Sequence, residues 1–166
     1  MIHFRQGTIQ DLHEIKDLAL RSWRAYQQEL PPEQWQQLKA GLTNDQTYQE
    51  LFEKSFCLLC LNEREEVIGM GFLVPSGNPT TIYDASWCAI RFISVDPLYG
   101  GRGIGRQLTE RCIQYAKENG ERTIALHTSE MMANARHIYE RLGFKVLREI
   151  DRRYGKRYWL YTMDLG

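Results

Sequence analysis

A dense run of glycines separates two segments of opposite periodicity in the second half of the chain. The stretch VDPLYGGRGIG, residues 95–105, holds four glycines within six positions. A strand-like apolar segment, ASWCAIRFISV, leads into it, and a helix-like segment, IGRQLTERCIQYAKENG, leads out of it. The first N–H groups of a helix have no internal partner and carry the positive end of its dipole, and glycines let the backbone approach a ligand closely. The junction therefore predicts a site for an anion such as a phosphate.

Two common phosphate loops do not fit this stretch. No Lys followed by Ser or Thr comes after the glycines, and the dinucleotide pattern G-x-G-x-x-G requires a glycine where Arg106 stands. The pattern alone therefore leaves three interpretations open. The glycines form a cradle for a phosphate of a different ligand, they serve a nucleotide in an unfamiliar way, or they only turn the chain.

Hydrophobic periodicity divides the rest of the chain into helices and strands. Helical spacing covers residues 8–26, 32–42, 45–54, 104–120 and 129–143, with Thr8 and Ser129 as expected caps of the first and last helix. Strand-like segments cover residues 2–6, 55–62, 66–74, 85–95, 123–128, 144–150 and 157–165. The segment 85–95 is the longest and most apolar of the three consecutive strands, so we expect it to be central. This order predicts a mixed sheet covered by helices, of α/β or α+β class, in a single domain of residues 1–166.

Charge and composition exclude several classes of partner. Lys and Arg together number 21, as do Asp and Glu, so no net field attracts nucleic acid. No apolar run is long enough to cross a bilayer and the N-terminal residues lack a secretory pattern, so we expect no membrane partner and a cytoplasmic location. Cysteines 57 and 60 point to opposite faces if they share a strand, and no second metal-ligand pair accompanies them. We therefore expect no metal site and four core cysteines: Cys57, Cys60, Cys88 and Cys112.

Three stretches together resemble a known family. VDPLYGGRGIGRQL, NARHIYERLGFKV and YWLYTMDL are similar to the motifs of the GNAT superfamily of N-acetyltransferases, whose members move an acetyl group from acetyl-CoA to an amine. The resemblance implies the GNAT fold, a central, mostly antiparallel mixed sheet flanked by helices. Gly103 and Gly105 match the family's turn, whereas Gly100 stands where Arg or Gln is usual. We expect the backbone cradle to survive this departure, because only one side chain is missing.

The resemblance also implies roles for individual residues. Backbone amides of the glycine turn would hold the pyrophosphate of coenzyme A, and main-chain groups of the preceding strand would pair with its pantetheine arm. Asn134 matches a position that commonly contacts the cofactor. Tyr139 matches one whose hydroxyl faces the sulfur and can protonate the thiolate that leaves, which makes it the expected catalytic acid. The full expected set of cofactor-binding residues is Ile93, Val95, Gly101, Arg102, Gly103, Ile104, Gly105, Arg106 and Asn134.

The sequence does not select the base that accepts the proton of the amine, nor the acceptor itself. His127, Glu130 and Asp84 are candidates for the base, and a core role is the stronger expectation for His127. Aromatic residues fall where the acceptor binds in relatives: Trp23, Tyr26, Trp35, Tyr48, Tyr83, Trp87, Tyr154 and Trp159. The expected partner is a small-molecule or peptide amine, and a homodimer is compatible with the sequence. A catalytically silent, acetyl-CoA-binding regulatory module is the alternative function.

Overall fold

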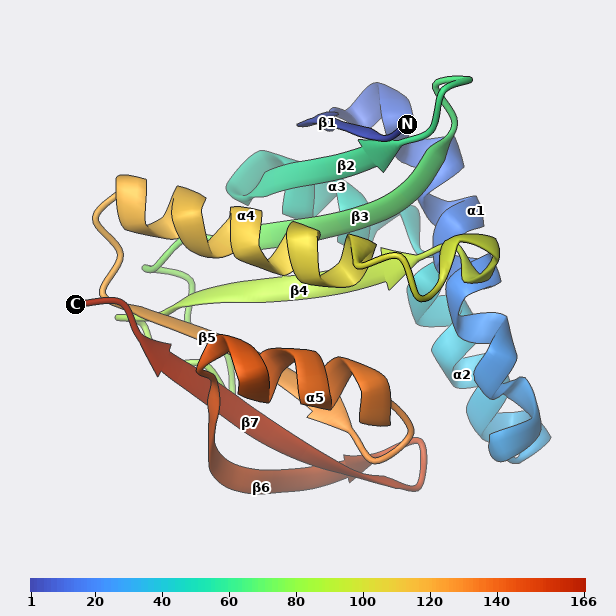
Figure 1. Ribbon diagram of the computed structural model, residues 1–166. Helices are drawn as coiled ribbons and strands as arrows, with labels where there is room; N and C mark the ends of the chain where they lie inside the picture. Colours follow the sequence, from blue (N-terminus) through green and yellow to red (C-terminus); the bar gives the residue numbers. More distant parts are fainter.

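A single seven-stranded sheet organises the computed structural model, which describes residues 1–166 (Figure 1). The strands are β1 (His3–Gln6), β2 (Phe56–Leu61), β3 (Val67–Val74), β4 (Cys88–Val95), β5 (Thr123–Ser129), β6 (Lys145–Arg153) and β7 (Lys156–Asp164). They lie in the order β1-β2-β3-β4-β5-β7-β6. All neighbours are antiparallel except β4 and β5, which run parallel. The predicted mixed, mostly antiparallel sheet is confirmed, and segment 85–95 supplies its central strand.

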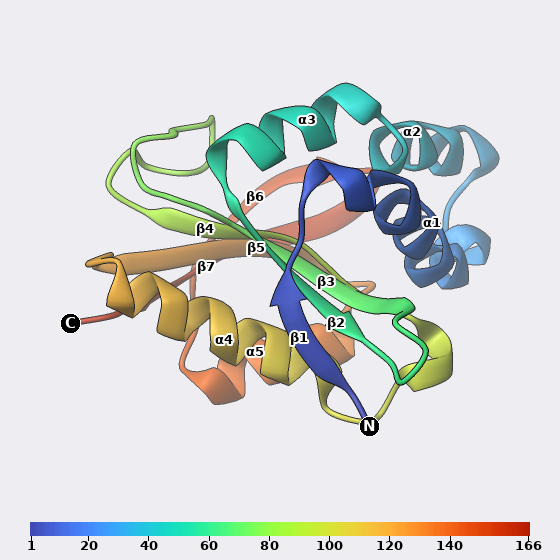
Figure 2. The same ribbon diagram turned by 90° about the horizontal axis from the view of Figure 1, so that it is seen from above.

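Helices cover both faces of the sheet (Figure 2). They are α1 (Leu12–Trp23), α2 (Pro32–Leu42), α3 (Asp45–Lys54), α4 (Ile104–Glu118) and α5 (Ala133–Leu142). The first three lie on one face, over a core that includes Leu18, Tyr48 and Phe72. The last two lie on the other face, where Leu108 and Cys112 of α4 are fully buried. None of the five helices combines the length and hydrophobicity that a membrane span requires.

Strand β3 shows how the sequence sets the distance between α4 and the sheet. Met70 and Phe72 point toward α1–α3, and the alternate positions, Gly69 and Gly71, point toward α4. A Cβ atom at Gly69 would lie 3.0 Å from a methyl carbon of Ile104, the first residue of α4. The glycines therefore let the start of α4 lie directly on the sheet. The strand prediction for the cysteines is likewise confirmed, because Cys57 packs in the core under α1–α3 and Cys60 in the core under α4.

Strands β4 and β5 separate soon after they meet. Only two residue pairs join them, Cys88 with Ile124 and Ala89 with Ala125. Beyond these pairs β4 bends at a bulge, where its register with β3 shifts and Phe92 adopts a positive φ of 57°. The carboxyl-terminal halves of β4 and β5 therefore diverge and leave a wedge in the middle of the sheet.

The sequence predictions agree with these elements, with three corrections. The helix predicted over residues 8–26 is α1 flanked by two 3-10 segments, Ile9–Asp11 and Arg24–Glu29, and Thr8 caps the first of these segments rather than α1. The strand predicted over residues 144–150 continues to Arg153. The last predicted helix, 129–143, was expected to begin at a Ser129 cap, but that cap is wrong. Ser129 is the final residue of β5, where it pairs with Tyr158 of β7, and Met132 stands at the N-cap of α5. Pairing with a neighbouring strand overrides the local capping preference of serine, because it satisfies the backbone over a longer stretch.

Candidate active site

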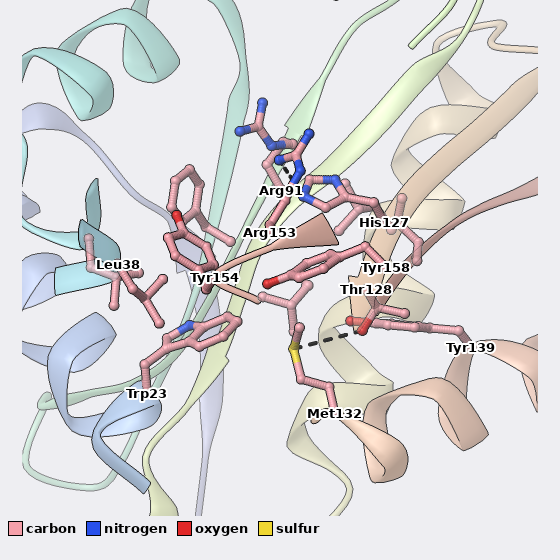
Figure 3. A pocket seen from close by; sticks show the side chains of 15 residues that line it. Trp23, Leu38, Arg91, His127, Thr128, Met132, Tyr139, Arg153, Tyr154 and Tyr158 are labelled. Atoms are coloured by element: carbon pink, nitrogen blue, oxygen red, sulfur yellow. Dashed lines mark hydrogen bonds between the residues drawn. The ribbon is translucent and has the colours of Figure 1, made fainter. Parts of the chain in front are cut away.

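The wedge between β4 and β5 opens into a cavity of about 170 Å³ (Figure 3). Ile90–Ile93 of β4 and Leu126–Thr128 of β5 form two of its walls. Helices α1, α2 and α5, the turn between β6 and β7 and the start of β7 close the remaining sides. Most of the lining is apolar, and three basic side chains reach it from three different strands: Arg91, His127 and Arg153. Such a concave apolar site with a few polar groups is typical of small-molecule binding.

Tyr139 lies on the α5 side of this cavity (Figure 3). Its ring is 7% exposed and packs edge-on against Phe144, with the ring centroids 6.0 Å apart. The hydroxyl forms no hydrogen bond with the protein, yet its oxygen is not sealed from the cavity. Burial raises the pKa of Tyr139 well above its ordinary value, so the hydroxyl keeps its proton at neutral pH. The arrangement is suited to a proton donor that faces a ligand.

The glycine turn presents a row of unpaired backbone donors. After the short 3-10 helix Pro97–Tyr99, the six consecutive N–H groups of residues 101–106 donate to no acceptor within the protein. Gly103 forms the N-cap of α4 with a φ of 78°, and its carbonyl accepts the Gln107 N–H at 3.0 Å. A left-handed conformation favours glycine, so the residue type follows from the turn. The predicted cradle residues are therefore together at one helix N-terminus, which attracts anions.

The outer half of β4 offers free main-chain groups between the turn and the cavity. The Asp96 N–H donates to the Ile68 carbonyl of β3 at 2.8 Å. Ile93 lies in the bulge beside Phe92. Hydrogen-bonding direction alternates along the regular part of an antiparallel strand, so the N–H and C=O of Val95 point away from β3. They point toward the side where β5 has ended its pairing. The predicted pantetheine strand thus has an unpaired edge, which is what strand addition by a ligand requires.

The same region brings α5 against the glycine turn. A Cβ atom at Gly105 would lie 3.7 Å from Val95 and 4.0 Å from Ile138, the neighbour of Tyr139. Asn134, by contrast, is exposed near the start of α5 and does not line the cavity. Arg102 and Arg106 are exposed; Arg102 stacks over the Tyr99 ring and Arg106 pairs with Glu110 at 3.4 Å.

Asp96 anchors the turn, a role that the sequence did not reveal. The residue is 7% exposed, and its carboxylate accepts the Leu98 N–H at 2.9 Å and meets the Arg21 guanidinium at 3.1 Å. Arg21 belongs to α1 and also contacts Asp17 at 2.7 Å. The ion pair therefore ties the entrance of the glycine turn to the opposite face of the sheet.

Replacement of Asp96 by alanine should lower the free energy of unfolding by roughly 1–3 kcal/mol, because a cap and a largely buried charge partner are lost. Urea unfolding measures this change. Asp17→Ala is the matched control, since it removes the exposed partner of the same Arg21 and should cost less than about 0.5 kcal/mol. Equal losses in both variants would contradict the anchoring role of Asp96.

The three candidate bases lie in different surroundings. Asp84 is exposed and bonds to Ser86, and Glu130 is exposed and accepts the Arg157 N–H, so neither lines the cavity. His127 does line it, with Nδ1 against the Tyr83 hydroxyl and Nε2 at 3.4 Å from Arg153. Burial, with Arg153 and Arg91 nearby, lowers the pKa of His127 to about 3. The imidazole is therefore neutral at pH 7 and a weak base.

Of the aromatic residues expected near an acceptor, Trp23 and Tyr154 line the cavity, and Tyr158 joins them without having been predicted. Trp35 and Tyr48 are core residues, and the Tyr48 hydroxyl donates to the Leu42 carbonyl at 2.8 Å. Arg91 was also missed. The signal was present, because it is the one charged residue in the strand CAIRFISV.

Comparison with known protein families identifies the family of this chain. The sequence profile of the Acetyltransferase (GNAT) family matches residues 12–144, which run from the start of α1 to just beyond the end of α5. The matched range includes the glycine turn and the cavity walls except Arg153, Tyr154 and Tyr158. The chain belongs to the GNAT family. The resemblance inferred from the three motifs is thereby confirmed.

Individual relatives of this GNAT protein match over limited stretches. N-acetyltransferase 8B of Homo sapiens is 29% identical over 102 residues, which are 61% of this chain and 44% of that protein. Mycothiol acetyltransferase of Rhodococcus erythropolis is 40% identical over 52 residues, which are 31% of this chain and 17% of that protein. The matches thus span less than half the length of these curated relatives.

Solved structures extend the likeness over the whole chain. The PaiA N-acetyltransferase of Thermoplasma acidophilum, in complex with coenzyme A, has a TM-score of 0.80 at 18% identity, covering 99% of both chains. The ribosomal-protein-S18-alanine N-acetyltransferase of Escherichia coli has a TM-score of 0.75 at 17% identity, covering 100% of this chain and 95% of that one. At such identities the likeness establishes the fold, which is that of the GNAT acetyltransferases.

Proposed function

We propose that this GNAT protein transfers the acetyl group of acetyl-CoA directly to a primary amine. The observation that carries the proposal is a continuous set of unpaired groups. Six free amides at the start of α4 lead to the free edge of β4, and that edge leads to a cavity lined by the unpartnered hydroxyl of Tyr139. A ligand with a diphosphate, an amide-rich arm and a reactive end meets complementary groups along this path.

The residues fit the acetyl donor in the following way. The amides of Gly101, Arg102, Gly103, Ile104, Gly105 and Arg106 would bind its pyrophosphate, and the main chain of Ile93 and Val95 would pair with its pantetheine arm. Arg102 and Arg106 are exposed on the same turn, where Gly100 supplies no side chain. Asn134, exposed on α5, would contact the part of the donor that lies outside the cavity.

Acetyl-CoA supplies an acetyl group that is activated as a thioester. The amine nitrogen forms a bond to the acetyl carbon while the bond from carbon to sulfur breaks. Tyr139 donates its hydroxyl proton to the departing sulfur. Solvent takes up the proton that the nitrogen loses and returns a proton to the Tyr139 oxygen. The products are an N-acetylated amine and the free thiol, so the reaction needs neither oxidant nor reductant.

No carboxylate lines the cavity, and His127 is too weak a base to compete well with water. We therefore assign the removal of the proton from the amine to water at the mouth of the cavity, or to amine that is already neutral in solution. Direct transfer needs no nucleophilic residue, so no acetylated protein intermediate is proposed.

A thiol-release assay with acetyl-CoA and a panel of primary amines tests the proposal, together with calorimetric binding of acetyl-CoA. Release that depends on an amine, with a saturable Kd for acetyl-CoA, is the expected result. Binding without release for any amine would instead favour the silent regulatory module, for which the absent side chain at Gly100 is the supporting feature. Failure to bind acetyl-CoA at all would refute both.

Several finer points stay proposals. The acceptor is a small-molecule or peptide amine; two similar proteins are named mycothiol acetyltransferase and ribosomal-protein-S18-alanine N-acetyltransferase. We further propose that residues 1–166 form one domain, because one sheet includes both the first and the last strand. A homodimer and a cytoplasmic location stay predictions.

A further inference from the structure

The cavity carries positive charge without a counter-ion. Arg91 and Arg153 both line it, and neither guanidinium has a carboxylate within 4 Å. None of the lining residues is acidic. Glu50 borders the neighbouring groove that Arg91 also lines, but it forms no ion pair with that arginine. Two unpaired guanidinium groups in a partly desolvated site are unfavourable unless an anion joins them.

The two arginines reach the same end of the cavity from distant parts of the chain. Arg91 lies in the central strand β4, and Arg153 is the last residue of β6 at the tight turn into β7. Figure 3 shows both guanidinium groups next to the His127 ring, and Arg153 contacts His127 Nε2 at 3.4 Å. Because a guanidinium only donates, Nε2 accepts, and the proton of the neutral ring sits on Nδ1 beside Tyr83. His127 therefore adds no negative charge and orients Arg153.

The rest of the lining excludes a strongly cationic ligand and accommodates an apolar body. Trp23, Leu38, Met132 and Tyr154 lie around the space below the arginines in Figure 3, and Leu42 also lines the cavity. A second ammonium group, as in a polyamine, would find two like charges and no carboxylate there. A carboxylate would find two planar donors of the geometry that it binds best.

We propose that the acceptor is a small amine that also carries a carboxylate, such as an amino acid with an apolar side chain, and that Arg91 and Arg153 bind this carboxylate. The inference rests on the proposed acetyl transfer and specifies its substrate class. The carboxylate lies at the arginine end of the cavity, and the amine points toward Tyr139. Arg91 and Arg153 are then specificity-determining residues, and a protein N-terminus, which lacks a nearby carboxylate, is a poorer acceptor.

Matched pairs of acceptors test the inference. Leucine, methionine and phenylalanine are compared with their carboxamides, 5-aminopentanoate with pentylamine, and O-phosphoethanolamine with ethanolamine. We expect kcat/KM to be roughly 10- to 100-fold higher for the acids than for their neutral partners, because a charge-assisted hydrogen bond is lost in the latter. Spermidine should be a poor acceptor. Activity of the phosphate compound above that of every acid would contradict the assignment to a carboxylate.

Variants locate the effect at the two arginines. Arg153→Gln and Arg91→Gln should raise KM for the acids by roughly 10- to 100-fold and for the carboxamides much less, because only the acids lose a charge-assisted hydrogen bond. Arg153→Lys should restore part of the preference for the acids. Arg148→Gln is the control, since Arg148 is exposed on the same strand and has no ion pair. Equal effects on acids and carboxamides, or equal activity of both with the unaltered protein, would overturn the inference and leave acetyl transfer standing.

Binding separates this inference from the proposed function. The CoA-loaded protein is titrated with the same acids and amides, and thermal stabilisation is recorded. Stabilisation by the acids that disappears in Arg153→Gln supports the carboxylate site even if no amine is acetylated, whereas turnover is the test of acetyl transfer. Absence of any selective stabilisation together with absence of acid-selective turnover refutes the carboxylate site.

Discussion

Replacement of Gly105 by aspartate should weaken acetyl-CoA binding by roughly 100-fold or more, because a carboxylate would stand where the diphosphate meets the first turn of α4. The fold should not suffer. The residue is helical with no positive φ, a Cβ atom there finds nothing closer than 3.7 Å, and an acidic side chain in the first turn favours the helix dipole. Isothermal titration calorimetry with acetyl-CoA and urea unfolding together measure the two effects.

Gly105→Ala and Gly105→Asn are the matched controls, since they add bulk without charge. They should retain most of the affinity. If the aspartate variant bound acetyl-CoA as well as the alanine variant did, the first turn of α4 would not be the pyrophosphate site. Gly103→Asp should abolish binding too, but its φ of 78° adds backbone strain, so it separates charge from conformation less cleanly.

Replacement of Tyr139 by phenylalanine should lower kcat by roughly 100-fold, within the range that a positioned proton donor contributes. The Kd for acetyl-CoA should not change, because the hydroxyl acts on the departing sulfur rather than on the bound donor. Stability should also be unaffected, since the hydroxyl has no hydrogen bond to lose. Steady-state thiol release, with the Kd measured separately, checks the prediction.

Tyr48→Phe provides the opposite pattern. That hydroxyl is buried and bonds to the Leu42 carbonyl, so its removal should cost stability and leave kcat unchanged. If Tyr139→Phe instead kept full turnover, the proton would reach the sulfur from another source, and the acid role would be wrong.

The sequence predicted elements best where local signals are strong. The bounds of α2 and α3 coincide with the predicted segments 32–42 and 45–54, because Pro32 opens the first helix and the Asn44 side chain accepts the Thr47 N–H at the start of the second. The glycine turn was likewise visible, since positive φ at Gly101 and Gly103 restricts the residue type.

Features that depend on distant segments were not predictable in the same way. Ser129 was assigned to a helix because nothing local reveals its pairing with Tyr158. The cavity depends on β7 inserting between β5 and β6, which carries Arg153 to the end of the wedge that already holds Arg91. The Asp96 and Arg21 pair joins residues 75 positions apart, so no pattern of spacing announces it.

The short junction between β4 and β5 has a mechanical consequence. Because only two residue pairs cross it, we expect the sheet to flex as two parts, β1–β4 and β5–β7, along this junction. A molecule that binds alongside β4 fills the gap between the two parts of the sheet and limits their relative motion. Ligand binding and the stiffness of the sheet are then coupled, and we expect the ligand-free protein to be the more flexible form.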